Sequence, residues 1–206
     1  MTNSAAMTYP MFLKLPDNST PLSYERHMTN QEFEDFCFAN PELVIEREAN
    51  GILKIMTPVS PISGQRETEF ITDLKIYARA HGGQAFSSST GFRLPDSSVK
   101  SPDACHVSAK QLAPFTKEQL RHFVEIVPEF IVEVVSPSDD LSDVEDKMRN
   151  AWIRNGVQLG WLVDVDEDKL WIYRADGSVE LVTPLDQIIT GEDVLPGFEF
   201  DLRILT

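Results

Sequence analysis

The stretch Phe130-Ile131-Val132-Glu133-Val134-Val135 is central to the fold prediction for this 206-residue sequence. Apolar residues occupy both faces of the expected strand, except for one acid, which is the pattern of a central strand buried on both sides. An ionised carboxylate at such a position must be paired, bound to a metal ion or placed at the edge of a cleft. Glu133 is therefore the first candidate functional residue.

Helical and hairpin signals precede this strand. Thr29 and Glu32 have the capping-box spacing, which predicts a short helix that begins there. Asn50-Gly51 accepts the positive φ values of a tight turn and predicts a hairpin between strands at 43–47 and 52–56. Apolar residues at helical spacing predict a long amphipathic helix from Ile62 to His81, which ends at Gly82-Gly83.

Further runs complete an α/β (α+β) prediction. Strands are expected at residues 84–88, 91–94, 102–107, 159–164, 170–174, 179–183 and 198–202, and a helix is expected at about 141–155. These elements predict a mixed β-sheet flanked by helices. Residues 1–28 mix prolines with polar residues and are expected to form an extended N-terminal arm, and residues 29–206 are expected to form a single domain.

The composition excludes several protein classes. The formal charge is 18 − 33 = −15, and 42% of the residues are hydrophobic, which is typical of a soluble globular protein. No run approaches the ~18 apolar residues of a membrane helix, and we see no secretion signal. The two cysteines, Cys37 and Cys105, have no CxxC spacing and fit a reducing compartment. A cytoplasmic protein without a membrane partner is the expectation.

Two carboxylates form the candidate metal site. Asp103 follows a proline at the start of a short apolar strand, where pairing ends and the side chain is expected near a sheet rim. Together with Glu133 on an adjacent strand it could bind one hard divalent cation. Mg²⁺, or Mn²⁺ in its place, needs few protein carboxylates, and the main-chain carbonyl of Val134 is the natural third ligand.

A lysine on the helix after the central strand is expected to complete the site. Lys147 lies fourteen residues after Glu133, and a helix that packs back on the sheet can return its amine to the strand end. There the amine could orient or deprotonate a metal-bound water, or stabilise charge on a transferring phosphate. Glu67 and Glu69 lie on the long helix and either could reach the cleft, but we expect each to face solvent.

An ordered series of motifs carries a resemblance to a known family. The motifs are Ser89-Thr90-Gly91-Phe92-Arg93-Leu94-Pro95, Ser101-Pro102-Asp103-Ala104, residues 127–139, Lys147, residues 155–164 and Gly191-Glu192-Asp193-Val194-Leu195-Pro196-Gly197-Phe198. Over roughly residues 30 to 203 they resemble the Uma-two family of restriction endonucleases, part of the PD-(D/E)XK nuclease superfamily. The resemblance implies a restriction-endonuclease-like core that cuts phosphodiester bonds with Mg²⁺ or a similar ion.

The family pattern transfers residue by residue. Pro102-Asp103 matches its PD, and Glu133 matches its D/E. In the PD-(D/E)XK motif the lysine follows the acid by two residues, where this chain has Val135. The Uma-two family's pattern places the lysine on the next helix instead, where this chain has Lys147. Trp152 lies five residues after Lys147, one more than the expected four, and one extra residue would rotate one end of an α-helix by ~100° relative to the other.

We expect a metal-dependent DNA endonuclease in which Asp103 and Glu133 bind the ion and Lys147 assists the attacking water. The alternative is a catalytically inactive nuclease-fold protein that serves as a regulatory or assembly module. A hydrolase of another phosphate ester would share the same metal site. Cleavage of both DNA strands would favour a homodimer with two-fold symmetry.

The charge is unevenly distributed along the chain. Residues 62–124 carry 8 basic and 6 acidic side chains, a balance of +2, whereas residues 1–61 carry −4 and residues 125–206 carry −13. Contacts to a DNA backbone are therefore expected from Arg66, Lys75, Arg79, Arg93 or Lys100.

Overall fold

The computed structural model describes residues 27–137 and 139–206. Almost all of the predicted N-terminal arm therefore lies outside the described residues. None of the helices in the described part is long and apolar enough to span a membrane.

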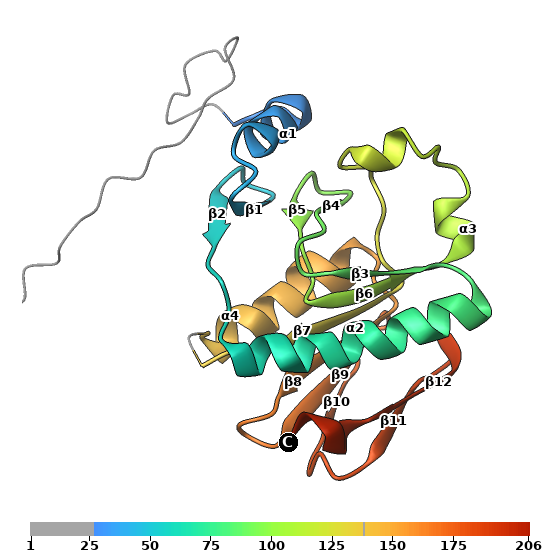
Figure 1. The fold of residues 1–206 in the computed structure, drawn as a ribbon. Coiled ribbons are helices and arrows are strands. Elements are labelled where there is room, and N and C mark those ends of the chain that lie inside the picture. The colour runs from blue at the N-terminus through green and yellow to red at the C-terminus, as the bar shows by residue number, and fades with distance from the viewer. Residues whose placement is uncertain (1–26, 138) are drawn as a thin grey trace, which may run out of the picture.

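A six-stranded mixed sheet forms the centre of the fold, in the order β10-β9-β8-β7-β6-β3 (Figure 1). Its strands are β3 (Gln84–Ser87), β6 (Ala104–Val107), β7 (Phe130–Val134), β8 (Leu159–Asp164), β9 (Lys169–Arg174) and β10 (Val179–Val182). Only β7 and β8 pair in parallel, and the other neighbours are antiparallel. The stretch around Glu133 is a central strand of this sheet, as the sequence predicts.

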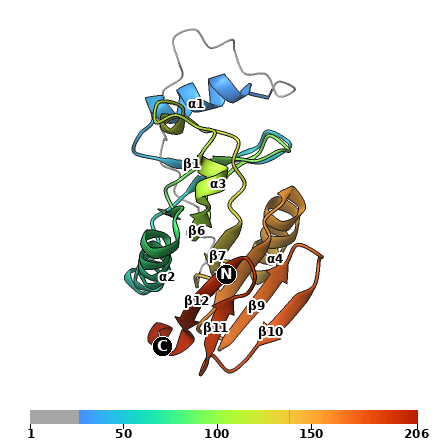
Figure 2. The ribbon, with the colours of Figure 1, turned by 90° about the vertical axis from the view of Figure 1, so that its right-hand side faces the viewer.

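Helices cover both faces of the central sheet, with α2 (Pro61–His81) on one side and α4 (Leu141–Asp146) on the other (Figure 2). The first face also carries the two-stranded sheet of β11 (Ile188–Gly191) and β12 (Leu195–Asp201), whose aromatic residues pack with those of α2. Phe130 and Val132 of β7 belong to this first core, whereas Ile131 belongs to the second core with Trp152. Because side chains alternate along a strand, Glu133 points to the α4 side.

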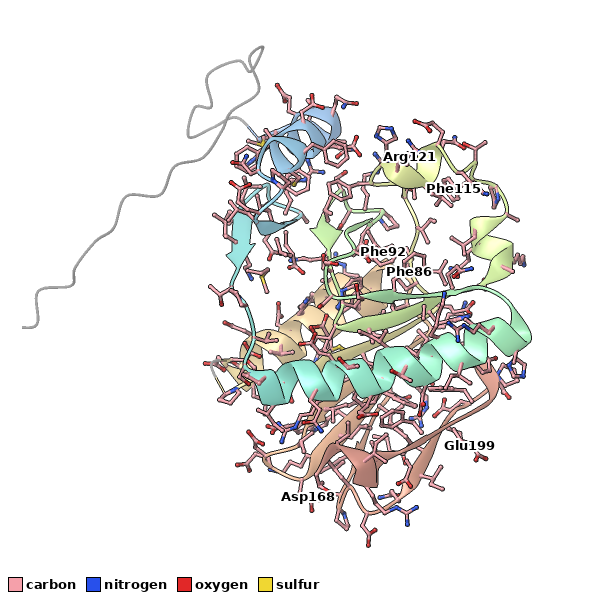
Figure 3. All side chains as sticks on the ribbon, viewed as in Figure 1. Phe86, Phe92, Phe115, Arg121, Asp168 and Glu199 are labelled. Atoms are coloured by element: carbon pink, nitrogen blue, oxygen red, sulfur yellow. The ribbon has the colours of Figure 1, made fainter. Side chains whose placement is uncertain are left out.

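A smaller sheet lies beside the central one, in the order β2-β1-β5-β4. It consists of β1 (Val44–Arg47), β2 (Leu53–Met56), β4 (Phe92–Arg93) and β5 (Val99–Lys100), and α1 (Asn30–Ala39) packs on it. Phe86 of β3 and Phe92 of β4 meet edge to face with ring centroids 5.5 Å apart, which joins the small sheet to the central one (Figure 3).

The local predictions are largely confirmed. The Thr29 hydroxyl accepts the Glu32 N–H, and the Glu32 carboxylate accepts the Thr29 N–H, so the capping box is present. Gly51 has φ +82° in the predicted hairpin turn. Strands β5 and β11 were not predicted, because two to four residues are too few to show a period. The short α3 (Ala109–Leu112) was also not predicted.

One prediction needs correction. The helix expected over about 141–155 is not a regular α-helix, because α4 ends at Asp146 and continues as the π-helix η2 (Lys147–Trp152) and the 3₁₀-helix η3 (Ile153–Asn155). This change of helix type occurs at the candidate lysine.

Candidate active site

Asp103 and Glu133 face each other across the two central strands β6 and β7. The antiparallel register pairs Ala104 with Val132, so the next pair along it is Asp103 and Glu133. Asp103 lies just before β6 begins, at the predicted rim, and its Oδ2 accepts the Val134 N–H at 2.7 Å. The main chain at the end of β7 therefore holds the Asp103 carboxylate beside Glu133.

Two donors, the half-buried Lys147 and the buried Trp152, hold the carboxylate of Glu133. The Lys147 Nζ lies 2.9 Å from its Oε1 and 3.1 Å from its Oε2. The Trp152 indole N–H donates to Oε1 at 2.7 Å. Glu133 is only 4% exposed, so these contacts replace the water that an ionised carboxylate would otherwise need.

The π-helix explains how two donors five residues apart reach one carboxylate. In an α-helix, five residues at about 100° each would leave Lys147 and Trp152 roughly 140° apart around the axis. The π-helical turn is wider, with bonds from residue i to i+5, such as that between the Ile153 N–H and the Met148 carbonyl. The fifth residue between Lys147 and Trp152 is accommodated within this wider turn. The rotation of about 100° that one extra residue would cause in an α-helix therefore does not occur.

Lys147 connects the central sheet to the small sheet. Its Nζ lies 3.4 Å from Glu46 Oε1 on β1 and donates to the Ser101 carbonyl at 3.3 Å. Burial opposes the charged amine, but the carboxylates of Glu133, Glu46 and Asp103 outweigh it and raise the pKa of Lys147.

The two facing carboxylates carry perturbed acidities. Burial raises the pKa of Glu133 to about 7, with Lys147 opposing the shift and Asp103 adding to it. Burial likewise raises the pKa of Asp103 to about 6, against the charge of Lys147 and the Val134 hydrogen bond. Carboxyl groups with such perturbed pKa values cluster at functional sites.

Glu46 was missed in the sequence analysis. Acids in hairpin strands are usually solvated, and no local pattern distinguishes this one. Its burial comes from the pairing of β1 with β5, which brings Lys100 Nζ to 3.1 Å from its Oε2. The Ser101 N–H also donates to its Oε1 at 2.9 Å. Burial raises the pKa of such a group, but the charges of Lys147 and Lys100 outweigh it and lower the pKa of Glu46.

Two predicted phosphate contacts are corrected by the structure. Lys100 is buried and paired with Glu46 and with Glu48, at 2.6 Å, so its amine does not face solvent. Arg66 is also buried, and its Nη2 donates to Asp166 at 2.8 Å. Neither side chain is available to an approaching DNA backbone in this conformation.

The two acids of α2 differ in position. Glu67 is buried, accepts a hydrogen bond from the Ser88 hydroxyl at 3.1 Å, and acts electrostatically on Glu133 and Asp103. Burial raises the pKa of Glu67, and the charge of Glu133 adds to the shift. The expectation of a solvent-facing Glu67 is therefore wrong, whereas Glu69 is half-buried. A buried acid on an amphipathic helix was not distinguishable from an exposed one by spacing alone.

The donor set suits a hard divalent cation. Within residues 27–137 and 139–206, no group of three or more His, Cys, Asp and Glu side chains could hold a metal ion. Two carboxylates with one main-chain oxygen are nevertheless enough for Mg²⁺, which keeps several of its waters. A cation would also favour the ionised forms of Asp103 and Glu133, which burial and the neighbouring acids disfavour. Strand residues direct their N–H and C=O to the same side, so the Val134 carbonyl faces the Asp103 side of β7.

Comparisons with known proteins concern the family and the fold. The family model described as "Uma2: Putative restriction endonuclease" matches residues 30–203. The crystal structure of "a putative nuclease belonging to DUF820" from Anabaena variabilis matches with a TM-score of 0.66 and 17% identity, covering 78% of this chain and 88% of that one, which shows a likeness of fold. A cryo-EM structure of a DrdV–DNA complex matches with a TM-score of 0.35 and 12% identity, over 58% of this chain and 12% of that one. No curated protein matches the chain.

Proposed function

Because this chain belongs to the Uma2 family of restriction endonucleases, we propose that it is a metal-dependent endonuclease that hydrolyses phosphodiester bonds in DNA. One observation supports this most directly. Asp103 and Glu133 occupy facing positions at the ends of two central strands, and the amine of Lys147 lies within 3.1 Å of both Glu133 oxygens. This combination of two carboxylates and one fixed cation suits the stabilisation of charge at a phosphate.

Asp103, Glu133 and the main-chain carbonyl of Val134 are the residues that would hold the ion. A bound Mg²⁺ or Mn²⁺ would neutralise phosphate charge and make a bound water more acidic. Asp103 is oriented for this task by the Val134 N–H, and Glu133 by the Trp152 indole. These hydrogen bonds fix the carboxylates before any substrate arrives, which lowers the cost of assembling the site.

The role of Lys147 follows from its charge state. Its raised pKa favours the protonated amine over the neutral form that a general base requires. A protonated amine instead donates hydrogen bonds and supplies positive charge to a phosphate oxygen or to the attacking water. Of the two roles considered from the sequence, charge stabilisation is the one that we propose.

Plasmid nicking with purified full-length protein tests the proposal. We expect Mg²⁺- or Mn²⁺-dependent cleavage, and we expect Asp103→Asn and Glu133→Gln each to reduce the rate by about 100-fold or more, since each would remove a ligand of the catalytic ion. Glu199→Gln is the matched control, because Glu199 is an exposed acid on β12 at the edge of the molecule (Figure 3). Calorimetric titration with Mn²⁺ should show binding to the wild type and to Glu199→Gln, and much weaker binding to Asp103→Asn.

Two outcomes would contradict the proposal. Cleavage by Asp103→Asn and Glu133→Gln at the wild-type rate would show that these carboxylates are not catalytic. A folded wild-type protein that neither binds Mn²⁺ nor nicks DNA would favour the inactive regulatory or assembly module. Urea unfolding of each variant is needed beside the rates, to show that loss of activity is not loss of structure.

A further inference from the structure

A cavity of about 220 Å³ lies between α1 and the small sheet, outside the candidate active site. The first turns of α1 line one side of it, and Arg47, Val99 and Arg93 line another. The strand register makes these three residues direct cross-strand neighbours, with Val99 paired to Arg47 on β1 and to Arg93 on β4. The two arginines therefore project from the same face of the small sheet.

This face is the opposite one from the active site. Val99 packs with Phe33 of α1, which places the arginine row on the α1 side. Glu46 and Lys100 are the chain neighbours of Arg47 and Val99, so they point to the other face, where Glu46 meets Lys147. The small sheet separates the cavity from the proposed catalytic groups, and the two sites are distinct.

Arg47 carries a buried charge that no acid offsets. Its Nη1 donates to the carbonyls of Met28 and Thr29, both at 3.2 Å, and its Nη2 donates to the Ser97 carbonyl at 2.6 Å and to the Asn30 side chain. All four acceptors are neutral. Within the described residues no carboxylate forms a salt bridge with it, and burial together with the nearby charge of Arg93 lowers the pKa of Arg47.

The side chain of Arg93 has even fewer partners than that of Arg47. Its side chain has no hydrogen bond and no ion pair with any described residue, and its buried Nε has no partner. The cavity also contains Glu34, but the Oε1 of that acid accepts the Phe123 N–H at 2.8 Å and lies 3.3 Å from His122 Nδ1. A buried polar atom without a partner requires an explanation, and an absent ion is one of the recognised ones.

We propose that this cavity binds a phosphate-type oxyanion between Arg47 and Arg93. Guanidinium groups are always charged, and their planar N–H arrays match the oxygens of phosphate. Arg47 is buried and Arg93 is half-buried, and neither forms an ion pair with a carboxylate of the described residues, so the two adjacent charges are costly unless an anion joins them. The cavity is many times larger than the roughly 15 Å³ that one water needs, so a tetrahedral oxyanion fits. Free phosphate, a nucleotide monophosphate and a DNA backbone phosphate share this chemistry.

Calorimetric titration of the full chain, in EDTA and at constant ionic strength, tests the cavity separately from nuclease activity. Three probes distinguish the source of the phosphate: inorganic phosphate, thymidine 5′-monophosphate and a DNA duplex without terminal phosphates. We expect saturable binding of at least one probe, weakened at least about tenfold by Arg93→Gln, because a charge-assisted hydrogen bond is lost. Arg203→Gln is the control, since Arg203 is an exposed arginine in the C-terminal 3₁₀-helix and pairs locally with Asp201.

The outcomes separate clearly. If Arg93→Gln weakens the binding of inorganic phosphate or of the monophosphate, the cavity is a small-anion site. If it weakens only the binding of the duplex, the cavity binds a phosphate of the DNA backbone. Wild-type affinity of Arg93→Gln for every bound probe, or no saturable binding of any probe, overturns the proposal. The Arg93 side chain makes no hydrogen bond with a described residue, so Arg93→Gln should match the wild type in urea unfolding without phosphate. When the binding probe is added, the wild type and Arg203→Gln should gain more stability than Arg93→Gln.

Discussion

Replacing Lys100 by methionine is expected to destabilise the protein by about 3–5 kcal/mol, the range found when a buried ion pair loses one partner. Both side chains of the Lys100–Glu46 pair are only 3% exposed, and their charged atoms lie 3.1 Å apart. At an effective dielectric constant of about 20, that distance corresponds to an attraction of about 5 kcal/mol. Methionine avoids the cost of burying the amine, which reduces the net loss.

Other contacts of Glu46 and Glu48 limit the loss of stability in Lys100→Met. Glu46 retains Lys147 at 3.4 Å and the Ser101 N–H at 2.9 Å after the change. Glu48, the second acid that pairs with Lys100, has a side chain that is 25% exposed and can regain water. The unpaired charge that matters is therefore that of Glu46. For a chain of this size, the expected loss lowers the midpoint of thermal unfolding by on the order of 10 °C.

The effect has a predicted pH dependence. Lys147 and Lys100 lower the pKa of Glu46 in the folded state, despite the opposing effect of burial. A lowered folded-state pKa contributes stability above the unfolded-state value, and that contribution is lost as the pH falls through the folded-state value. Lys100→Met removes part of this contribution. The free-energy difference between wild type and variant should therefore be greatest near pH 7 and shrink below about pH 4.

Urea unfolding from pH 7.5 to pH 3.5 measures both quantities. Lys54→Met is a matched control, because Lys54 pairs with the same Glu48 Oε1 at 3.0 Å but its side chain is 60% exposed. That exposed pair should contribute less than about 1 kcal/mol. Adding Glu46→Gln to Lys100→Met should recover part of the lost stability. A Lys100→Met variant that is as stable as Lys54→Met at pH 7 would refute the argument from burial.

Two predictions concern the helix after β7. Deleting Asn150 should convert the π-turn to an α-turn that keeps Lys147 and Trp152 on Glu133, and the free energy of unfolding should change by less than about 1 kcal/mol. An alanine inserted after Asn150 should instead separate the two donors and destabilise the protein. Equal effects of deletion and insertion in urea unfolding would contradict this account of the turn. Trp152→Phe removes the 2.7 Å hydrogen bond to Glu133 and should cost about 1.5–3 kcal/mol; a loss below about 0.5 kcal/mol would show that the carboxylate finds another donor.

Local chemistry in the sequence was sufficient for most of the framework. The capping box at Thr29, the turn at Gly51 and the long amphipathic helix depend on residues within a few positions of one another. The apolar residues on both sides of Glu133 likewise identify a strand buried on both faces. Asp103 and Lys147 were also expected beside Glu133, and the structure brings all three together.

The remaining features depend on contacts between distant segments, which no local pattern encodes. Glu46 becomes part of the site only because a two-residue strand, β5, pairs with β1 and because Lys147 reaches it from a helix 101 positions away in the sequence. Arg47 and Arg93 become neighbours through the same strand. The spacing of Lys147 and Trp152 was visible in the sequence, but only the packing of both side chains on one buried carboxylate selects a π-turn over a rotated α-helix. The tertiary structure thus decided which charged side chains are buried together, because strand register between distant segments places them and burial sets the energy of each charge.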